Sequence, residues 1–338
     1  MKMTEISVLF KKQRSLIATS AILLSVMVCG ANAEESIEVV RSGIPHDSLY
    51  DVAINGEIGF AVGNAGLLIE TKDAGATWTQ LERMGNQAFL AIASKGDRTL
   101  IAGQKGTIMS KTGDGAWETV ETPFETRLMK IDFNASGLVV AVGEFGLIHR
   151  SKDGGSSWDT IIIDWMQYND EGYEPHLYDV TVRDDNNVVV VGEFGLILWS
   201  EDGGDSFIAR HKGDESIFAL HLDSEGTGTS FAVGQDNLII RSQDGGQTWQ
   251  KMKVPGEDSN LLAVWSGQGE VVITGIRTLL RSSDDGETWA KSEDIQVVRT
   301  WYQGLTTGVA EVSAGNGFLR SQAVYAVGQQ ARISRVTK

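Results

Sequence analysis

The chain has 338 residues, of which 41% are hydrophobic, 39 are glycine, four are proline and one is cysteine. This composition supplies ample apolar material for a core and excludes a collagen-like, coiled-coil or wholly disordered chain. The 45 acidic residues outnumber the 29 basic ones and give a formal net charge of −16. Because so acidic a surface repels phosphate backbones, we expect no nucleic-acid partner.

The first 33 residues have the pattern of a secretory signal peptide. A cationic segment precedes the largely apolar residues 16–28, and Ala31–Ala33 forms a small-x-small cleavage site. The apolar segment is shorter than the roughly 20 residues that span a bilayer, which disfavours a membrane anchor. Cys29 would suit a lipoprotein signal, but Val28 before it is not the small residue that such signals carry. We therefore expect cleavage after Ala33 and export to the periplasm or the exterior.

A repeated eight-residue box dominates the rest of the chain. Each copy begins with Ser or Thr and has an aspartate third, a glycine fifth and an aromatic residue last. The aspartates are Asp73, Asp153, Asp202, Asp244 and Asp284, and the aromatic residues are Trp78, Trp158, Phe207, Trp249 and Trp289. A sixth copy, Ser110–Trp117, has Thr112 in the aspartate position. A glycine ends an apolar segment before each of these boxes, and a seventh such glycine, Gly328, completes seven units.

Each unit is predicted to form four β-strands. In the third unit, a short apolar strand at Leu128–Ile131 precedes a second strand at Leu138–Gly143, and a tight turn at Glu144–Gly146 leads to a third strand. The box then makes the hairpin to a fourth strand. The chain after residue 33 has no sustained 3.6-residue apolar period. At about 44 residues per unit, the fold class is all-β, and residues 34–338 are predicted to form a single seven-bladed β-propeller.

The boxes have a structural interpretation that needs no ligand. The aspartate can accept hydrogen bonds from N–H groups across the turn, the glycine permits a positive φ, and the aromatic ring packs beneath the blade. A calcium loop needs alternating oxygen ligands and a closing bidentate glutamate, which the boxes lack. We expect neither a metal nor a cofactor.

The two ends of the propeller are predicted to share one blade. The seventh unit runs out after Arg332–Arg335, where its box would begin, and Ile37–Val40 is a strand without a unit of its own. Ile37 precedes Leu49 by the same interval that separates Trp249 from Leu261. Ile37 should therefore take the aromatic position of the last blade, and pairing of the two ends would remove the open edge of the ring.

One face of such a ring carries the candidate site. The turns after the second strands and the segments that lead into the first strands share this face, whereas the boxes lie on the other. An insertion of about eight residues within 161–176 joins the third and fourth blades on this face. The residues predicted to form an aromatic and acidic protein-binding patch are Glu144, Phe145, Glu193, Phe194, Trp165, Tyr168, Tyr173, His176 and Arg127. The alternative is that Phe145 and Phe194 pack inward between blades.

A second insertion lies on the box face. About 13 extra residues within Thr306–Gln322 join the first two strands of the last blade. Their Gly and Ser content predicts a mobile loop with no assigned role. We expect substitutions in this loop to leave partner binding unchanged.

The pattern Val-Gly-x-x-Gly-x-Ile-x-x-Ser-x-Asp-Gly-Gly-x-x-Trp, best seen in residues 142–158 and 191–207, resembles the photosystem II stability/assembly factor family within the BNR/Asp-box propellers. The resemblance covers nearly all of the chain after residue 33 and is more specific for fold than for function. It implies a non-catalytic factor, outside the cytoplasm or in the thylakoid lumen, that holds a membrane-protein intermediate during assembly. The basic patch by which family members hold their client is not evident among the 25 basic and 44 acidic residues after residue 33.

The predicted function is an exported, monomeric, non-catalytic binding factor that recognises an envelope or membrane protein and does not itself span the membrane. The competing class is a glycosidase or glycan-binding Asp-box propeller. Sialidases need an Arg-Ile-Pro segment near the N-terminus, which this chain lacks, and xyloglucanase-type enzymes generally use two propellers. The glycosidase alternative stays open, because an acid pair could come from Asp47, Glu144, Glu193, Asp214 and Glu215.

Overall fold

The computed structural model describes residues 36–169, 171–223, 229–256, 258–314 and 317–337. The chain divides into two units, Met1–Glu34 and Glu35–Lys338. The predicted signal peptide and Cys29 lie outside the described residues. The description below concerns the second unit by itself.

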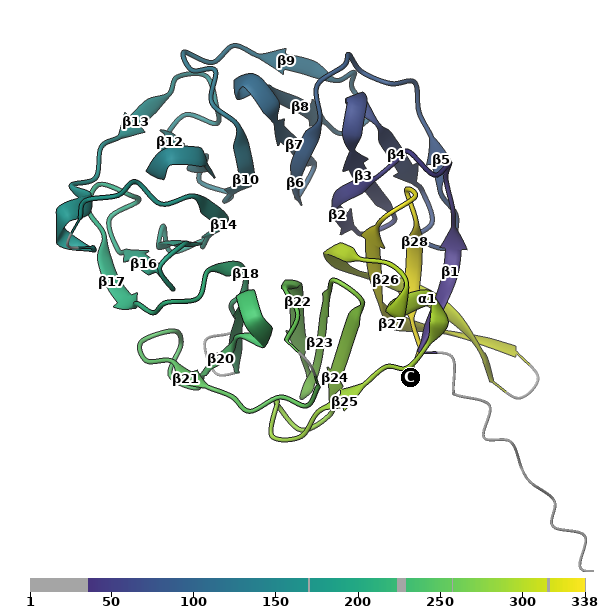
Figure 1. Ribbon diagram of the computed structural model, residues 1–338. Helices are drawn as coiled ribbons and strands as arrows, with labels where there is room; N and C mark the ends of the chain where they lie inside the picture. The colour runs from purple at the N-terminus through teal and green to yellow at the C-terminus, as the bar shows by residue number, and fades with distance from the viewer. Residues whose placement is uncertain (1–35, 170, 224–228, 257, 315–316, 338) are drawn as a thin grey trace, which may run out of the picture. The chain divides into compact units, whose positions relative to one another are not determined.

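Seven four-stranded antiparallel sheets are arranged around a common axis in the part of the chain that the structure describes (Figure 1). From the innermost to the outermost strand, blade 1 comprises β2 (Leu49–Asn55), β3 (Ile58–Gly63), β4 (Leu68–Thr71) and β5 (Thr79–Gln80), and blade 2 comprises β6 (Phe89–Lys95), β7 (Arg98–Gly103), β8 (Ile108–Thr112) and β9 (Glu118–Val120). Blade 3 comprises β10 (Leu128–Phe133), β11 (Val139–Gly143), β12 (Ile148–Ser151) and β13 (Asp159–Ile161), and blade 4 comprises β14 (Leu177–Val182), β15 (Val188–Gly192), β16 (Ile197–Ser200) and β17 (Ile208–His211). Blade 5 comprises β18 (Ile217–His221), β19 (Ser230–Gly234), β20 (Ile239–Ser242) and β21 (Gln250–Lys251), and blade 6 comprises β22 (Leu261–Gly267), β23 (Glu270–Gly275), β24 (Thr278–Ser282) and β25 (Ala290–Lys291). Blade 7 comprises β26 (Tyr302–Ala314), β27 (Gly317–Gly328), β28 (Ile333–Val336) and β1 (Ile37–Arg41).

Short helical turns lie in some of the connections between strands. Four 3₁₀ turns lie between second and third strands, namely η1 (Asn64–Gly66), η2 (Gln104–Gly106), η3 (Glu144–Gly146) and η5 (Gln235–Asn237). A fifth turn, η4 (Trp165–Gln167), and the helix α1 (Ile295–Val298) lie in segments that lead into innermost strands. Within the described ranges, no helix has the length and apolar character needed to cross a bilayer.

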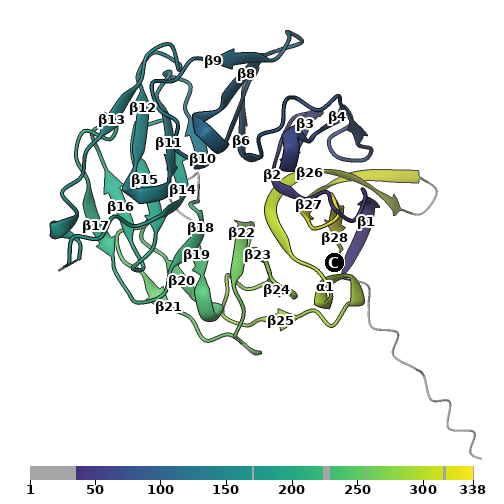
Figure 2. The same ribbon diagram turned by 45° about the horizontal axis from the view of Figure 1, so that its top comes forward.

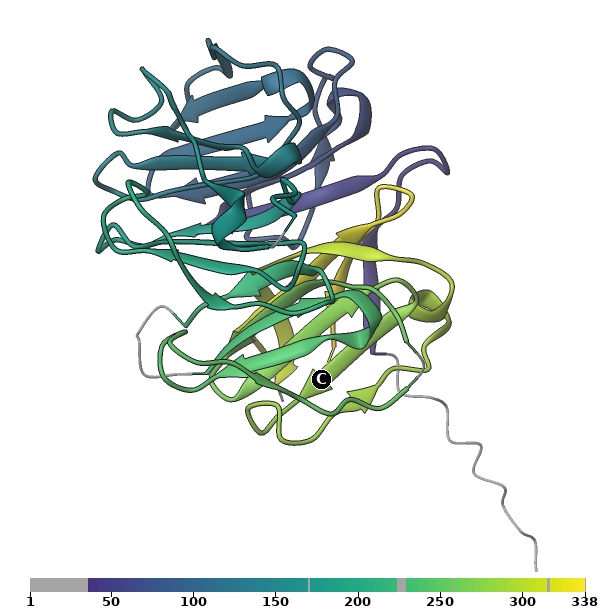
Figure 3. The ribbon, with the colours of Figure 1, turned by 60° about the vertical axis from the view of Figure 1, so that its left-hand side comes forward.

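The core consists of apolar layers between successive blades. Every residue of β11, β15 and β19 is buried, as expected for strands that are covered on both faces. Val140 and Val142 of blade 3 pack with Val180 and Val190 of blade 4 in one such layer. Figure 3 shows the sheets stacked face against face around the ring. Each blade is therefore stabilised by both of its neighbours.

The ends of the propeller meet in blade 7, as predicted. Strand β1 pairs antiparallel with β28, with Ile37 opposite Val336 (Figure 1). Ile37 is 2% exposed and packs with Leu279, Val297 and Tyr302. Because Ile37 fills an inter-blade layer, the N-terminal strand contributes to the core as well as to the hydrogen-bonded ladder.

The prediction that the segment Thr306–Gln322 forms a mobile loop is wrong. Its described residues, 306–314 and 317–322, belong to the long hairpin of β26 and β27, which is paired from Leu305 opposite Ala326 to Ala314 opposite Gly317. The hairpin extends beyond the other strands of its blade (Figure 2). The backbone N–H of Val309 donates to the carbonyl of Ala74 at 3.0 Å. The insertion is thus ordered by its own ladder and by contact with the box of blade 1.

Arginine side chains join several blades on the box face. Nη1 of Arg150 donates to the carbonyl oxygen of Gly203 at 3.0 Å and to Asp205 Oδ1 at 2.6 Å, both in the next box. Nη1 of Arg241 contacts the following box in the same way, through the carbonyl oxygen of Asp285 at 2.9 Å and Glu287 Oε1 at 2.7 Å. Part of the charge on this face is therefore used to hold neighbouring blades together.

Candidate protein-binding face

The box aspartates bind donors of their own hairpins. Asp244 Oδ1 accepts hydrogen bonds from the Thr248 N–H at 2.9 Å and the Ser242 hydroxyl at 2.8 Å. Its Oδ2 accepts the Thr248 hydroxyl at 2.6 Å. These bonds, with those of Thr248 the strongest, lower the pKa of Asp244 to about 2. Equivalent bonds are made by Asp73, Asp153, Asp202 and Asp284.

The box aromatic residues close the same hairpins. The indole N–H groups of Trp78, Trp158 and Trp249 donate to the glycine carbonyls of their own boxes at 2.9, 3.1 and 3.2 Å. Phe207 and Trp289 take the same position and pack against inter-blade layers. No group of three or more His, Cys, Asp or Glu suited to a metal ion occurs among the described residues. This geometry supports the structural role predicted for the boxes.

On the opposite face, the predicted glutamates bind backbone. Glu144 Oε1 accepts the N–H of Arg127 at 3.1 Å, and Glu193 Oε2 accepts the N–H of His176 at 2.8 Å. Asn64 and Gln104 make the same bond to Ser48 and Ala88 in blades 1 and 2. The first residue of each of these turns thus holds the segment that leads into the innermost strand. The signal was present in the sequence, since all four residues carry a side-chain carbonyl or carboxylate oxygen at the same position.

The two predicted phenylalanines lie differently. Both take a positive φ, 57° for Phe145 and 58° for Phe194, as does Ala65 at the same turn position in blade 1. Phe145 is 56% exposed. Phe194 is half-buried and packs against the layer between blades 3 and 4, so the expectation that both rings project from the surface is wrong for Phe194.

The insertion between blades 3 and 4 also packs more than predicted. Trp165 is 7% exposed and belongs to the core layer that contains Leu177. Its indole covers Gly146, where an added Cβ would lie 2.5 Å from Nε1. The prediction that Trp165 is an exposed contact residue is therefore wrong, because the missing side chain of Gly146 opens a slot that the indole fills. Of the other two aromatic residues, Tyr168 donates its hydroxyl to the carbonyl of Phe207 at 2.8 Å, and Tyr173 is 62% exposed.

A row of aromatic rings runs from the rim of this face to the axis. Phe145 contacts His176 edge-on, with ring centroids 5.3 Å apart. His176 and Tyr178 are 6.4 Å apart, and Tyr178 and Phe218 are 5.0 Å apart. We call these four residues the aromatic row. It links the turn of blade 3 to the innermost strands of blades 4 and 5.

The row ends at a ring of residues that surrounds the axis. A cavity of about 320 Å³ opens there, and Arg127 lines it together with residues of the innermost strands. The second residue of each innermost strand forms what we call the collar: Tyr50, Leu90, Met129, Tyr178, Phe218, Leu262 and Gln303. The collar was not predicted from the sequence, although six of its seven positions are apolar or aromatic.

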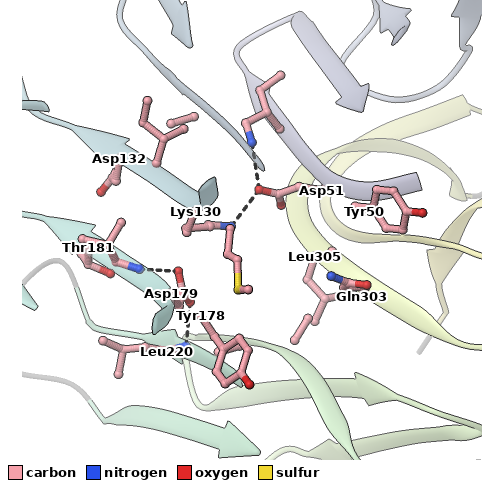
Figure 4. A pocket seen from close by; sticks show the side chains of 18 of the residues that line it. Tyr50, Asp51, Lys130, Asp132, Tyr178, Asp179, Thr181, Leu220, Gln303 and Leu305 are labelled. Carbon is pink, nitrogen blue, oxygen red and sulfur yellow. Dashed lines mark hydrogen bonds and ion pairs between the residues drawn. The ribbon is translucent and has the colours of Figure 1, made fainter. Parts of the chain in front are cut away.

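Charged side chains lie below the collar, in an axial cavity of about 290 Å³ (Figure 4). Lys130 Nζ lies 2.8 Å from Asp51 Oδ2 and so connects blade 3 to blade 1. Asp51 Oδ2 also accepts the N–H of Ile92, and Asp179 Oδ2 accepts the N–H of Leu220 at 2.8 Å. Each carboxylate thereby satisfies a backbone donor of the next blade's innermost strand, whose axial edge has no neighbouring strand. We call Asp51, Lys130 and Asp179 the floor.

The floor perturbs two ionisation equilibria. Burial alone would lower the pKa of Lys130, but the carboxylates of Asp51 and Asp179 outweigh it and raise that pKa. Burial raises the pKa of Asp179 to about 6, although Lys130 opposes the shift. Lys130 is therefore charged at neutral pH, and Asp179 takes up a proton at a higher pH than an ordinary aspartate does.

The structure brings together Phe145, His176 and Arg127 of the predicted patch and adds the collar to them. Comparison with known proteins identifies the family of the chain. The family model described as "Photosynthesis system II assembly factor YCF48" matches residues 110–207 and 163–319. The chain belongs to this family.

Individual YCF48 relatives agree with that assignment. The "Photosystem II assembly lipoprotein Ycf48" of Synechococcus sp. (strain CC9902) is 30% identical over 114 residues, which cover 31% of this chain and 34% of the relative, so the match spans about a third of that protein. The structure "YCF48 bound to D1 peptide" has a TM-score of 0.68 at 17% identity and covers 90% of this chain and 97% of its own. YCF48 from Cyanidioschyzon merolae has a TM-score of 0.69 at 17% identity and covers 89% and 98%.

Propellers outside the YCF48 family share the architecture as well. The GH74 xyloglucanase from Xanthomonas campestris has a TM-score of 0.63 at 15% identity and covers 88% of this chain and 53% of its own. At these identities the solved structures show the fold alone. The predicted resemblance to the assembly-factor family is confirmed by the family match, which favours a binding factor over an enzyme.

Proposed function

We propose that this chain is an exported, non-catalytic assembly factor that binds a segment of a membrane protein on the face that carries the aromatic row. Membership of the YCF48 family supports the role in assembly. A relative in that family has been solved with a D1 peptide, which supports a polypeptide segment as the ligand. Export and the monomeric state are parts of this proposal, which cell fractionation and light scattering test.

The observation that carries the proposal is the aromatic row, in which Phe145 is exposed and His176, Tyr178 and Phe218 are half-buried. Phe145 presents more than half of its surface to solvent, and its contacts lead through His176 and Tyr178 to the axis. Aromatic side chains that remain accessible next to one another contribute most strongly to protein interfaces, because each buries a large area at a small entropic cost. A continuous row of this kind suits an extended polypeptide segment.

The carboxylates of this face fit a binding role better than a glycosidase. Glu144 and Glu193 each hold a backbone N–H of a segment next to the innermost strands. Glu193 also accepts the Tyr178 hydroxyl at 3.3 Å. A general acid needs a proton to donate at a free position. These glutamates instead stabilise the face as acceptors.

Affinity capture from detergent-solubilised membranes of the source organism tests the proposal. We expect the wild-type chain to retain a membrane protein and Phe145→Ala to retain at most about a tenth as much. Alanine suits this position because Ala65 takes a φ of 48° in the equivalent turn. The matched control is Ile208→Ala, since Ile208 is 57% exposed on the outer strand β17, away from the axis. Equal capture by Phe145→Ala and the control would contradict the proposed face.

An activity screen tests the competing class. A panel of aryl glycosides and a glycan array should give no turnover and no binding with the wild-type chain. Turnover that disappears in Glu144→Gln or Glu193→Gln would overturn the non-catalytic assignment. These substitutions retain an acceptor oxygen for the backbone N–H, so they separate loss of chemistry from loss of the turn.

A further inference from the structure

The collar and the floor form one continuous axial pocket. Six of the seven residues that line the cavity of about 320 Å³ also line the cavity of about 290 Å³. In three innermost strands a collar residue directly precedes a floor residue: Tyr50 and Asp51, Met129 and Lys130, Tyr178 and Asp179. One residue of strand rises about 3.3 Å, so charge lies within a few ångströms of the apolar collar. A ligand that enters from the aromatic row meets apolar surface first and charge second.

The charged groups that line the pocket are unequally paired. Lys130 is bound by Asp51, and deeper in the channel Lys95 Nζ lies 2.8 Å from Asp132 Oδ1. Asp179 forms no salt bridge with any described residue. Its oxygens bind the backbone N–H groups of Val180 and Leu220, at 2.9 and 2.8 Å. Arg127, which lines the cavity of about 320 Å³, adds a third positive charge to the pocket, and Asp179 is the one carboxylate of the three that has no cation within salt-bridge distance among the described residues.

We propose that the axial pocket receives one lysine side chain of a partner polypeptide, with its methylene stem against the collar and its ammonium group at Asp179. This inference rests on the proposed function, since it specifies the segment that the same face would bind. A lysine stem is apolar along four methylenes and ends in a compact charge, which matches the order of surfaces in the pocket. A purely apolar side chain would cover Asp179 without neutralising it, at a cost in desolvation.

The titration of Asp179 agrees with this assignment. Its pKa is raised to about 6, first because burial disfavours the charged form. The other titratable groups that line the axial cavity are Tyr50 and Asp51 on β2, Lys95 on β6, Lys130 and Asp132 on β10, Tyr178 on β14, and His221 on β18, whose pKa burial lowers. Lys130 is already shared with Asp51. An ammonium group from outside would give Asp179 the direct salt bridge that no described residue provides, since Lys130 acts on it only from beyond salt-bridge distance.

Small probes of the lysine side chain test the pocket in the intact protein. The chain is labelled with ¹³C at the methionine methyl groups, because Met129 lies in the collar and Met252 packs between other blades. We expect n-pentylammonium to shift the Met129 signal saturably at a concentration about tenfold below that needed for n-pentanol or n-pentanoate at equal ionic strength. Met252 should not respond. Equal responses to the three probes, or a preference for n-pentanoate, would overturn the inference.

Two aspartate substitutions provide a matched pair. Asp179→Asn should weaken n-pentylammonium binding about tenfold. Asp132→Asn should change it by less than about twofold, because Lys95 already neutralises Asp132. Both carboxylates accept an N–H of the next blade, from Leu220 and Val182 at 2.8 Å, so the two variants lose comparable structural bonds. Equal effects would overturn the inference, and if Asp179→Asn does not fold, the probe comparison on the wild-type chain decides.

Membrane capture separates this inference from the function on which it rests. Capture that requires Phe145 but is unchanged in Asp179→Asn would overturn the lysine pocket and leave the binding function standing. Absence of capture by the wild-type chain would overturn the binding function, whereas the selectivity among the three probes is read without any partner. Loss of capture in both Phe145→Ala and Asp179→Asn, with Asp132→Asn retained, is the expected result.

Discussion

The box hairpin Ser242–Trp249 in blade 5 and the turn Glu144–Gly146 in blade 3 lie on opposite faces of the ring, and each is held by a carboxylate that accepts nearby donors. In the box, Trp249 is half-buried and bound to its own hairpin. In the turn, Phe145 remains 56% exposed. The carboxylates of both segments serve the fold, and the difference between the segments lies in where the aromatic ring points.

That difference separates repeated from unrepeated positions. The box residues and the first residue of the turn make the same hydrogen bonds in several blades. We call these repeated residues the framework of the propeller. Phe145 and the collar vary from blade to blade, as Ala65, Lys105 and Asp236 do at the position of Phe145. We therefore expect changes in the framework to alter stability and changes at the unrepeated positions to alter binding.

Removal of β1 should have the largest effect on the framework. A chain that begins at residue 42 loses the ladder to β28 and the core contribution of Ile37, and we expect about 3–5 kcal/mol less unfolding free energy than in a chain that begins at residue 36. Denaturant titration of the two chains measures the difference. A transition midpoint that does not move would show that the ring does not depend on its closure.

Loss of a box carboxylate should have the next largest effect. Asp244→Ala leaves the N–H and hydroxyl donors of Thr248 without their partner, and we expect a loss of about 1–3 kcal/mol. The pKa of Asp244 lies below its unfolded value, so its contribution is present above pH 4 and is lost as the pH falls toward 2.

Calcium or a chelator should leave the melting temperature unchanged. A shift of several degrees with either would contradict a metal-free box.

The burial of His149 should make the free energy of unfolding depend on pH. The size of this effect should equal or fall below the loss expected for Asp244→Ala. His149 is 2% exposed, stacks on Phe124 with ring centroids 3.6 Å apart, and contacts the hydroxyls of Thr126 and Thr160 at 3.1 and 3.0 Å. Burial lowers its pKa to about 4. Because the unfolded chain takes up this proton near pH 6.5 and the folded chain does not, stability is lost as the pH falls from 6.5 toward 4.

Comparison with His149→Gln isolates this contribution. Between pH 7 and pH 5 the wild-type chain should lose roughly 1–2 kcal/mol more than the variant in denaturant titrations. Asp179 acts in the opposite sense, since its raised pKa favours the folded chain on acidification, but it is present in both chains and cancels. Parallel pH profiles would show that His149 is accessible to protons in the folded state.

The smallest effect on stability is expected at the unrepeated position. Phe145→Ala should change the unfolding free energy by less than about 0.5 kcal/mol while it reduces partner capture. Capture by the wild-type chain should also weaken as salt rises, since a basic segment would meet an acidic protein. Calorimetry and capture on the same preparations measure both quantities. A variant that unfolds would place Phe145 within the framework.

The framework could be predicted because its causes are local and repeated. The box residues fall at fixed spacing, and the interval from Ile37 to Leu49 matched the intervals in other units, so blade number and closure followed from the sequence. The hairpin of β26 and β27 was missed because Gly and Ser are typical of loops, whereas continuous pairing between the two strands holds this segment in a ladder.

The site was less predictable because its causes are spread over several blades. Trp165 is buried by a slot at Gly146, which lies 19 positions earlier in the turn between β11 and β12, and no local pattern indicates this contact. The collar and the floor each combine single residues from different blades. Neither the apolar alternation within a strand nor the spacing of the boxes indicates that these side chains meet at the axis. Phe145 was identified because a phenylalanine at a turn tip departs from what the turn itself requires.

The pairing of β1 with β28 in blade 7 also determines when the ring can close during synthesis of the chain. Glu38 and Arg335, which contact each other across β1 and β28, are 297 positions apart in the chain. Six blades are built from consecutive strands and can pair as the chain is made, whereas the seventh needs residues from both ends. Contacts of such large sequence separation form late because loop closure precedes any gain from pairing. A growing chain therefore cannot close into a ring, and β1 stays unpaired, until β28 has been synthesised.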